Sequence, residues 1–99
     1  MKWITVTAIP SVGALWNAVL PAVYRVGQLS DRELIKAWKY ACTARYMVER
    51  GISPRSEKWN QRHMLRQCAD LGHLRTIEQE VKRRHLDENY GIEITDITI

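Results

Sequence analysis

One uncharged stretch in the first third of the chain limits how the whole chain can fold. No residue from 3 to 24, between Lys2 and Arg25, carries a charge. Threonine, proline, serine, glycine and asparagine residues interrupt its apolar content, so the stretch fits a membrane span or a secretory signal poorly. We therefore expect residues 3–24 to be buried in a soluble, cytoplasmic protein that has no membrane partner.

The size and composition indicate one ordinary globular domain spanning residues 1–99. The chain has 99 residues, of which 45% are hydrophobic and 26% are charged. A chain of this length can bury one modest core but not two. This composition also disfavours disorder over most of the length.

The charges that follow the uncharged stretch are unevenly distributed. Residues 1–86 contain all fifteen Lys and Arg residues against seven acids, a net charge of +8, whereas residues 87–99 contain four acids and no basic residue. A basic body attracts nucleic acid or an acidic protein surface, although it also suits a merely solvated surface.

The clearest local signal predicts a helix over residues 31–50. Ser30 and Glu33 have the spacing of a capping box, and Asp31 places negative charge at the positive end of the helix dipole. Gly51 suits a left-handed residue that ends the helix, with Ile52 folding back on Met47.

The remaining elements follow from proline, glycine and hydrophobic periodicity. We expect a strand over residues 2–9, a helix over 11–26 that Pro21 kinks or divides, helices over 54–71 and 73–88 separated at Gly72, and a strand over 91–99 with a bulge at Thr95 and Asp96. The fold class is mainly α (α+β): three or four helices, short N- and C-terminal strands, and an antiparallel helical hairpin of helices 31–50 and 54–71.

Patterns of catalytic, metal-binding or cofactor-binding residues are absent from the sequence. The histidines share no zinc-type spacing with one another or with Cys42 and Cys68, and no glycine-rich phosphate loop is present. We interpret both cysteines as reduced core thiols and His85 as a neutral residue closing the apolar seam of its helix. We expect no enzyme and no cofactor.

The predicted helix 54–71 carries the main candidate binding face. Its buried stripe contains Met64, Leu65, Cys68 and Leu71, and a tryptophan lies among basic residues on the other side. A tryptophan beside arginines can stack on a nucleic-acid base or anchor a protein contact. The alternative is a solvated face with the indole covering a neighbouring helix. The face consists of Arg55, Lys58, Trp59, Arg62 and Arg66.

Two further sets of residues are candidates for contacts. Helix 73–88 presents Arg75, Gln79, Lys82 and Arg83, which suit phosphates and a base edge if helices 54–71 and 73–88 form a helix-turn-helix with the last strand as a wing. Arg45 and Glu49 either form an ion pair on their own helix or lie in a partner interface.

We expect a non-enzymatic binding protein that contacts nucleic acid or a nucleoprotein through its basic helical face. The alternative is a protein-directed inhibitor or adaptor, in size and lack of motifs of the general kind of small phage-encoded inhibitors of host defence complexes. A third is a structural subunit docked through residues 3–24. A homodimer joined through the terminal strands would pair their open edges, and a monomer in light scattering would exclude it.

Overall fold

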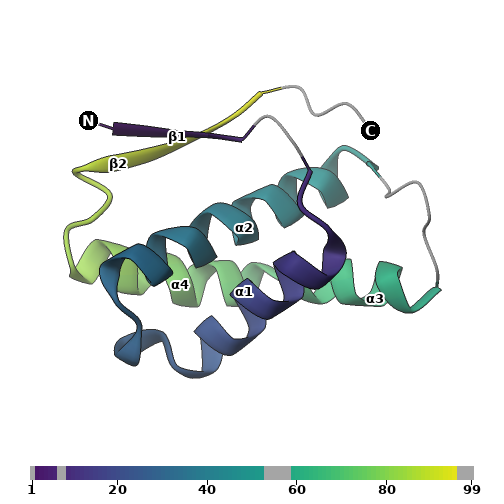
Figure 1. The fold of residues 1–99 in the computed structure, drawn as a ribbon, viewed down its shortest axis with the longest axis horizontal. Helices are drawn as coiled ribbons and strands as arrows, with labels where there is room; N and C mark the ends of the chain where they lie inside the picture. The colour runs from purple at the N-terminus through teal and green to yellow at the C-terminus, as the bar shows by residue number, and fades with distance from the viewer. Residues whose placement is uncertain (1, 7–8, 53–58, 96–99) are drawn as a thin grey trace.

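The protein is mainly helical, with one small sheet formed by its two ends. The computed structural model describes residues 2–6, 9–52 and 59–95, and for Trp59 and Asn60 the backbone alone. In chain order the elements are β1 (Lys2–Val6), α1 (Val12–Tyr24), the 3₁₀ helix η1 (Val26–Gln28), α2 (Asp31–Glu49), α3 (Trp59–Cys68), α4 (Leu71–Arg83) and β2 (Tyr90–Ile94) (Figure 1).

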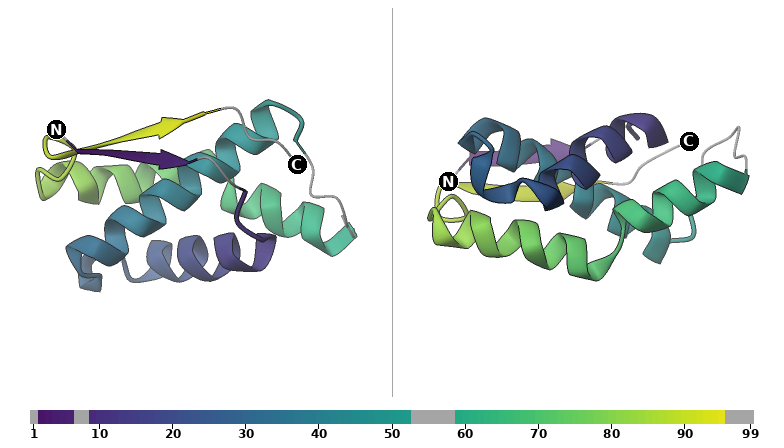
Figure 2. Two further views of the ribbon diagram at one scale, coloured as in Figure 1. Left: turned by 45° about the horizontal axis from the view of Figure 1, so that its top comes forward. Right: turned by 90° about the horizontal axis from the view of Figure 1, so that it is seen from below.

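Helix α2 is the central element of the fold. It packs against α1, α3, α4 and both strands. Its buried face is rich in alanine, including Ala37, Ala41 and Ala44, which lets neighbouring helices approach closely. Figures 1 and 2 show α1, α3 and α4 running opposite to α2, so the expected antiparallel arrangement of α2 and α3 is present. The connection over residues 53–58, where helix 54–71 was expected to begin, lies outside the described residues.

The predicted ends of α2 are confirmed. The Ser30 hydroxyl accepts a hydrogen bond from Glu33 N–H at 3.2 Å, and a Glu33 carboxylate oxygen accepts one from Ser30 N–H at 3.1 Å. At the other end Gly51 has φ 66°, and Ile52 N–H donates to the Met47 carbonyl at 2.8 Å. Both motifs join residues only three to five positions apart, so the local sequence suffices to specify them.

The boundary between α3 and α4 was predicted wrongly at Gly72. Helix α3 ends at Cys68, and α4 begins at Leu71, so Gly72 lies in the first turn of α4. Asp70 causes the shift, because its carboxylate accepts hydrogen bonds from the backbone N–H of Gly72 at 2.8 Å and His73 at 3.2 Å. An aspartate at this position satisfies two backbone donors that a helix start leaves without an intrahelical partner, which stabilises a start at Leu71.

Helix α4 also ends earlier than predicted, and His85 is not in a buried seam. His85 has φ 58° and an exposed side chain whose Nδ1 lies 3.2 Å from a Glu88 carboxylate oxygen. The backbone N–H groups of His85 and Leu86 donate to the carbonyls of Lys82 and Val81, both at 3.0 Å. This is the hydrogen-bond pattern of a left-handed helix cap, which here uses histidine where glycine is usual.

Helix α1 continues through Pro21 and does not divide there. Ser11 caps its start by accepting from Ala14 N–H at 3.1 Å. Helix α1 ends at Tyr24, before the expected end at residue 26, and the chain continues into η1. The buried side of α1 includes Leu15 and Val19, so part of the uncharged stretch contributes to the core, whereas Trp3 and Tyr24 are exposed and the expected burial of residues 3–24 holds only in part.

The two terminal strands pair with each other in parallel. Lys2 pairs with Tyr90 and Val6 with Ile94, and Lys2 N–H donates to the Asn89 carbonyl at 3.0 Å. Val6 is buried on the face toward α2, whereas Trp3 is 60% exposed on the other face.

The strands are shorter than the expected 2–9 and 91–99. The bulge at Thr95 and Asp96 cannot be compared because residues 96–99 lie outside the described part, and the homodimer stays a prediction.

Candidate functional site

The described part of the predicted binding face on α3 is exposed. Arg62 and Arg66 are exposed one turn apart, while Leu65 and Cys68 on the other side of α3 are buried. Arg55 and Lys58 lie outside the described residues. Trp59 is the residue at which α3 begins, and only its backbone is described. The structure therefore brings together two of the five predicted residues and leaves the placement of the indole a prediction.

Arg62 and Arg66 meet the end of α2. They border a cleft of about 310 Å³ whose other lining residues come from α2, its cap and α3. Arg50, the residue before Gly51, is also exposed, and its guanidinium lies 5.0 Å from the centre of the Tyr46 ring. Basic side chains from two helices thus flank the same end of the molecule. The other lining residues are Met47, Val48, Gly51, Ile52 and Leu65.

Helix α4 turns its two carboxylates toward the protein. A Glu78 carboxylate oxygen lies 3.4 Å from Trp38 Nε1, which donates to it from α2. Glu80 is only 9% exposed and forms ion pairs with Arg83 and Arg84. The hydrogen bond from Arg83, together with the one from Arg84, holds the pKa of Glu80 below its usual value despite burial, which acts the other way.

The outward side of α4 keeps the basic and amide residues that the sequence predicted. Arg75, Gln79 and Lys82 are exposed at successive turns. Arg83 is exposed as well, but its guanidinium is engaged by Glu80. Asp70 is the exposed acid in residues 61–83, and its carboxylate caps α4. The exposed charges of residues 61–83 are therefore basic except for the Asp70 carboxylate, which already accepts hydrogen bonds from backbone N–H groups.

Arg45 and Glu49 form the ion pair expected within their own helix. Arg45 Nε lies 2.8 Å from a Glu49 carboxylate oxygen, and both side chains are substantially exposed. Arg45 Nη1 also donates a long hydrogen bond, at 3.5 Å, to the Ala69 carbonyl at the end of α3. The guanidinium is thus used inside the fold, where it links α2 to the α3–α4 junction.

The α3–α4 pair does not have the shape of a groove-reading helix-turn-helix. Two residues, Ala69 and Asp70, separate the helices, fewer than the three or four of that motif. Figures 1 and 2 show α4 continuing in roughly the direction of α3, whereas the second helix of the motif crosses the first steeply. The two helices consequently lie end to end, with a bend between them.

The thiols of Cys42 and Cys68 and the imidazole of His73 are buried or hydrogen-bonded within the fold. Burial raises the pKa of the Cys42 and Cys68 thiols to about 12, and both are free cysteines. His73 Nδ1 lies 2.8 Å from the Gln67 carbonyl oxygen, which can only accept, so that nitrogen carries a proton. Within residues 2–6, 9–52 and 59–95, no group of three or more His, Cys, Asp or Glu side chains is placed to hold a metal ion.

Sequence reasoning missed the contacts that Glu80 and Arg84 make. Arg84 is mostly buried and contacts residues more than fifty positions earlier. The one available signal was the spacing of Glu80 and Arg84 at i and i+4, which by itself predicts only a weak surface pair.

Comparisons with protein-family models, with curated proteins and with solved structures gave no match. None of the helices in the described ranges is both long and apolar enough to cross a membrane.

Proposed function

We propose that the chain is a non-enzymatic binding protein whose outer α3–α4 face contacts the phosphate backbone of nucleic acid, alone or within a nucleoprotein. The observation that carries this proposal is the sorting of charge on these helices. Glu78 and Glu80 point inward to α2 and to arginines, whereas Arg66, Arg75 and Lys82 are exposed. We name Arg62, Arg66, Arg75 and Lys82 the basic face.

The basic face suits phosphates better than base edges. Guanidinium and ammonium groups along an outer face contact successive phosphates, and their attraction does not depend on base sequence. A two-residue connection and a bend much shallower than the steep crossing of a helix-turn-helix offer no separate recognition helix for the major groove. We therefore expect binding with little sequence preference.

A salt titration tests the proposal. Fluorescence anisotropy with a labelled DNA duplex is measured between about 50 and 200 mM salt, where each phosphate contact contributes a slope of about one in log K against log salt. The combined change Arg66→Gln, Arg75→Gln and Lys82→Gln is expected to reduce that slope by about three and to weaken binding at low salt. The matched control Arg25→Gln, Lys36→Gln and Lys39→Gln removes the same charge from the end of α1 and from α2.

Equal weakening by both triple variants would contradict the proposal, because binding would then follow net charge alone. The competing function, a protein-directed inhibitor or adaptor, predicts a different result. In a pull-down from the native host, a nucleic-acid contact is lost after nuclease treatment. A partner that survives both nuclease and salt that strips DNA would favour the protein-directed function and overturn the nucleic-acid one.

A further inference from the structure

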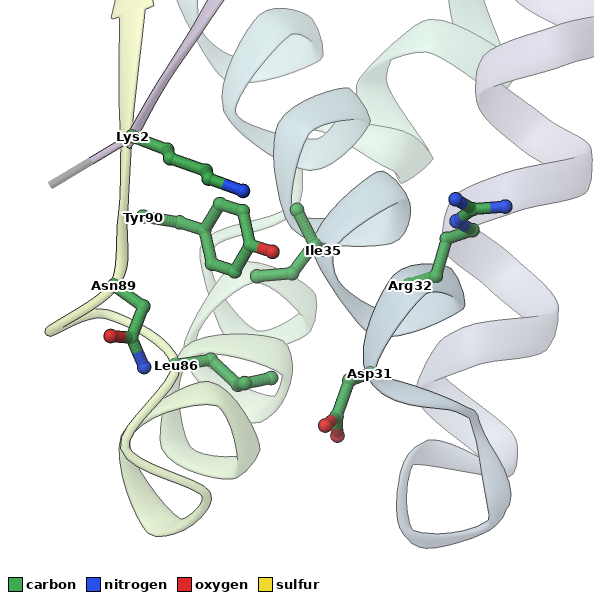
Figure 3. Close-up of a pocket in the computed structure, with 7 residues that line it drawn as sticks. All are labelled: Lys2, Asp31, Arg32, Ile35, Leu86, Asn89 and Tyr90. Atoms are coloured by element: carbon green, nitrogen blue, oxygen red, sulfur yellow. The ribbon is translucent and has the colours of Figure 1, made fainter.

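A second site lies away from the basic face, where the two strands begin. A cleft of about 790 Å³ opens between the start of the sheet, the first turns of α2 and the connection from α4 to β2 (Figure 3). Small-molecule sites in proteins typically have volumes of roughly 300–1,000 Å³. The size of this cleft therefore fits one small organic molecule.

The parallel register of the strands builds this cleft. Lys2 and Tyr90 are register partners at the first position of the sheet, and Tyr90 N–H donates to the Leu86 carbonyl at 3.0 Å. Alternation along β1 places Lys2 on the same face as Ile4 and Val6, toward α2. Residues separated by most of the chain thus meet at one opening.

Two polar groups point into the cleft without a partner in the described part of the protein. Figure 3 shows the Lys2 ammonium and the Tyr90 hydroxyl directed into the space in front of Ile35. Neither group forms a hydrogen bond or an ion pair with a described residue. Ile35 and Leu86, each 8% exposed, supply the apolar floor. A cation and a hydroxyl above an apolar floor suit a ligand that is anionic at one end.

The charge balance of the lining also favours an anion. Asp31 is the acidic residue among those that line the cleft, and its carboxylate pairs with Arg84 Nη1 at 3.1 Å. Arg32 adds a second positive charge at the rim, although Figure 3 shows its guanidinium directed away from Lys2. The charge of Lys2 is therefore not offset inside the cleft.

We propose that this cleft binds a small organic anion. A carboxylate or phosphate monoester of the ligand accepts hydrogen bonds from Lys2 Nζ and the Tyr90 hydroxyl, while its apolar or aromatic body covers Ile35 and Leu86. Charged hydrogen bonds of this kind are the stronger ones, and the apolar body adds burial that a bare anion lacks. This inference is independent of the nucleic-acid proposal, because the basic face shares no residue with the cleft.

The test is an NMR titration of the full chain with four probes. Phenyl phosphate and benzoate carry both an anion and an aromatic body, inorganic phosphate carries the anion alone, and phenol carries the ring alone. We expect saturable shifts at the backbone amides of Ile35, Asn89 and Tyr90 with phenyl phosphate or benzoate, and affinity at least about tenfold weaker for the two partial probes. If phenyl phosphate binds more tightly than benzoate, the cleft prefers a phosphate monoester, and if benzoate binds more tightly, it prefers a carboxylate.

Variants decide whether the shifts report this cleft. Lys2→Gln is expected to weaken the tighter probe about tenfold, and Tyr90→Phe severalfold with the ring still packed on the core. The control Lys36→Gln removes an exposed lysine of α2 that lines no part of this cleft and should leave the affinity unchanged. Absence of saturable shifts, or equal weakening by Lys2→Gln and Lys36→Gln, would overturn the proposal.

Discussion

Arg84 Nη1 donates a hydrogen bond to the carbonyl oxygen of Leu29, 55 residues earlier in the chain, at 2.7 Å. Its other terminal nitrogen donates to the carbonyls of Val26 at 3.3 Å and Gly27 at 3.4 Å. One mostly buried guanidinium thereby donates to two carbonyl oxygens of η1 and to that of Leu29, the residue that follows it. Arg84 consequently ties the end of α4 to the connection between α1 and α2.

Arg84→Met is expected to lower the free energy of unfolding by about 2 kcal/mol, because several carbonyls and the Glu80 carboxylate lose a buried donor together. Urea unfolding monitored by circular dichroism measures the change. Arg83→Met is the matched control, since Arg83 pairs with the same carboxylate from an exposed position and should cost distinctly less. Equal costs for the two variants would show that the contacts to η1 contribute nothing.

The stability of the protein should fall on acidification partly through Glu80 and Glu33. Hydrogen bonds from Arg83 and from Ser30 N–H, respectively, lower the pKa of these carboxyls below the ordinary 4.5. A lowered native pKa contributes stability that is complete above 4.5 and is lost as the pH falls through the native value. Glu80→Gln should therefore be less stable than wild type above pH 4.5, and the difference should shrink as the pH falls below 4.5. A difference that stays constant with pH would contradict this.

His85→Gly is expected to stabilise the protein by about 1 kcal/mol, because the native φ of 58° is strained for a residue with a Cβ. His85→Ala keeps the Cβ and should show no such gain. Thermal unfolding of the two variants makes the comparison. If alanine stabilises as much as glycine, the gain comes from removing the imidazole and not from the backbone.

Gly91 lies directly under the Trp3 indole of its register partner. A Cβ added at Gly91 would lie 2.5 Å from Trp3 Cζ3, closer than two carbons can pack. Gly91→Ala should cost about 1 kcal/mol in the wild-type background and nothing in a Trp3→Ala background. A double-mutant cycle in urea measures this coupling, and a coupling of zero would mean that the indole swings away freely.

Both thiols should resist alkylation in the native protein. The pKa of about 12 for Cys42 and Cys68 leaves almost no thiolate at neutral pH, and the thiolate is the reactive form. Iodoacetamide labelling followed by mass spectrometry should be slow in buffer and rapid in urea for both residues. Rapid labelling of Cys42, the less buried of the two, without urea would contradict its raised pKa.

The exposure of the described candidate residues could be predicted because helical periodicity decides which side chains share a side of a helix, whereas the side chains of Arg55, Lys58 and Trp59 lie outside the described part. Arg62, Arg66, Arg75, Gln79 and Lys82 are all exposed, as their spacing indicated. The spacing does not reveal that Arg83 is engaged by Glu80, since that depends on which carboxylates the packing turns inward.

The cleft where the two strands begin was not predicted. One signal for this cleft was available in the sequence. Lys2 is the one charged side chain before Arg25, and strand alternation places it on the same face as Ile4 and Val6.

The sequence by itself determined the local motifs: the Ser30–Glu33 capping box, the Gly51 helix end and the apolar side of α1 that contributes to the core. Each depends on hydrogen bonds or periodicity within one or two turns. The tertiary structure alone decided that β1 pairs in parallel with β2 and that Arg84 reaches η1. The physical reason is distance along the chain, because partners separated by fifty to ninety residues are chosen by the packing of the whole core around α2, which no local spacing encodes.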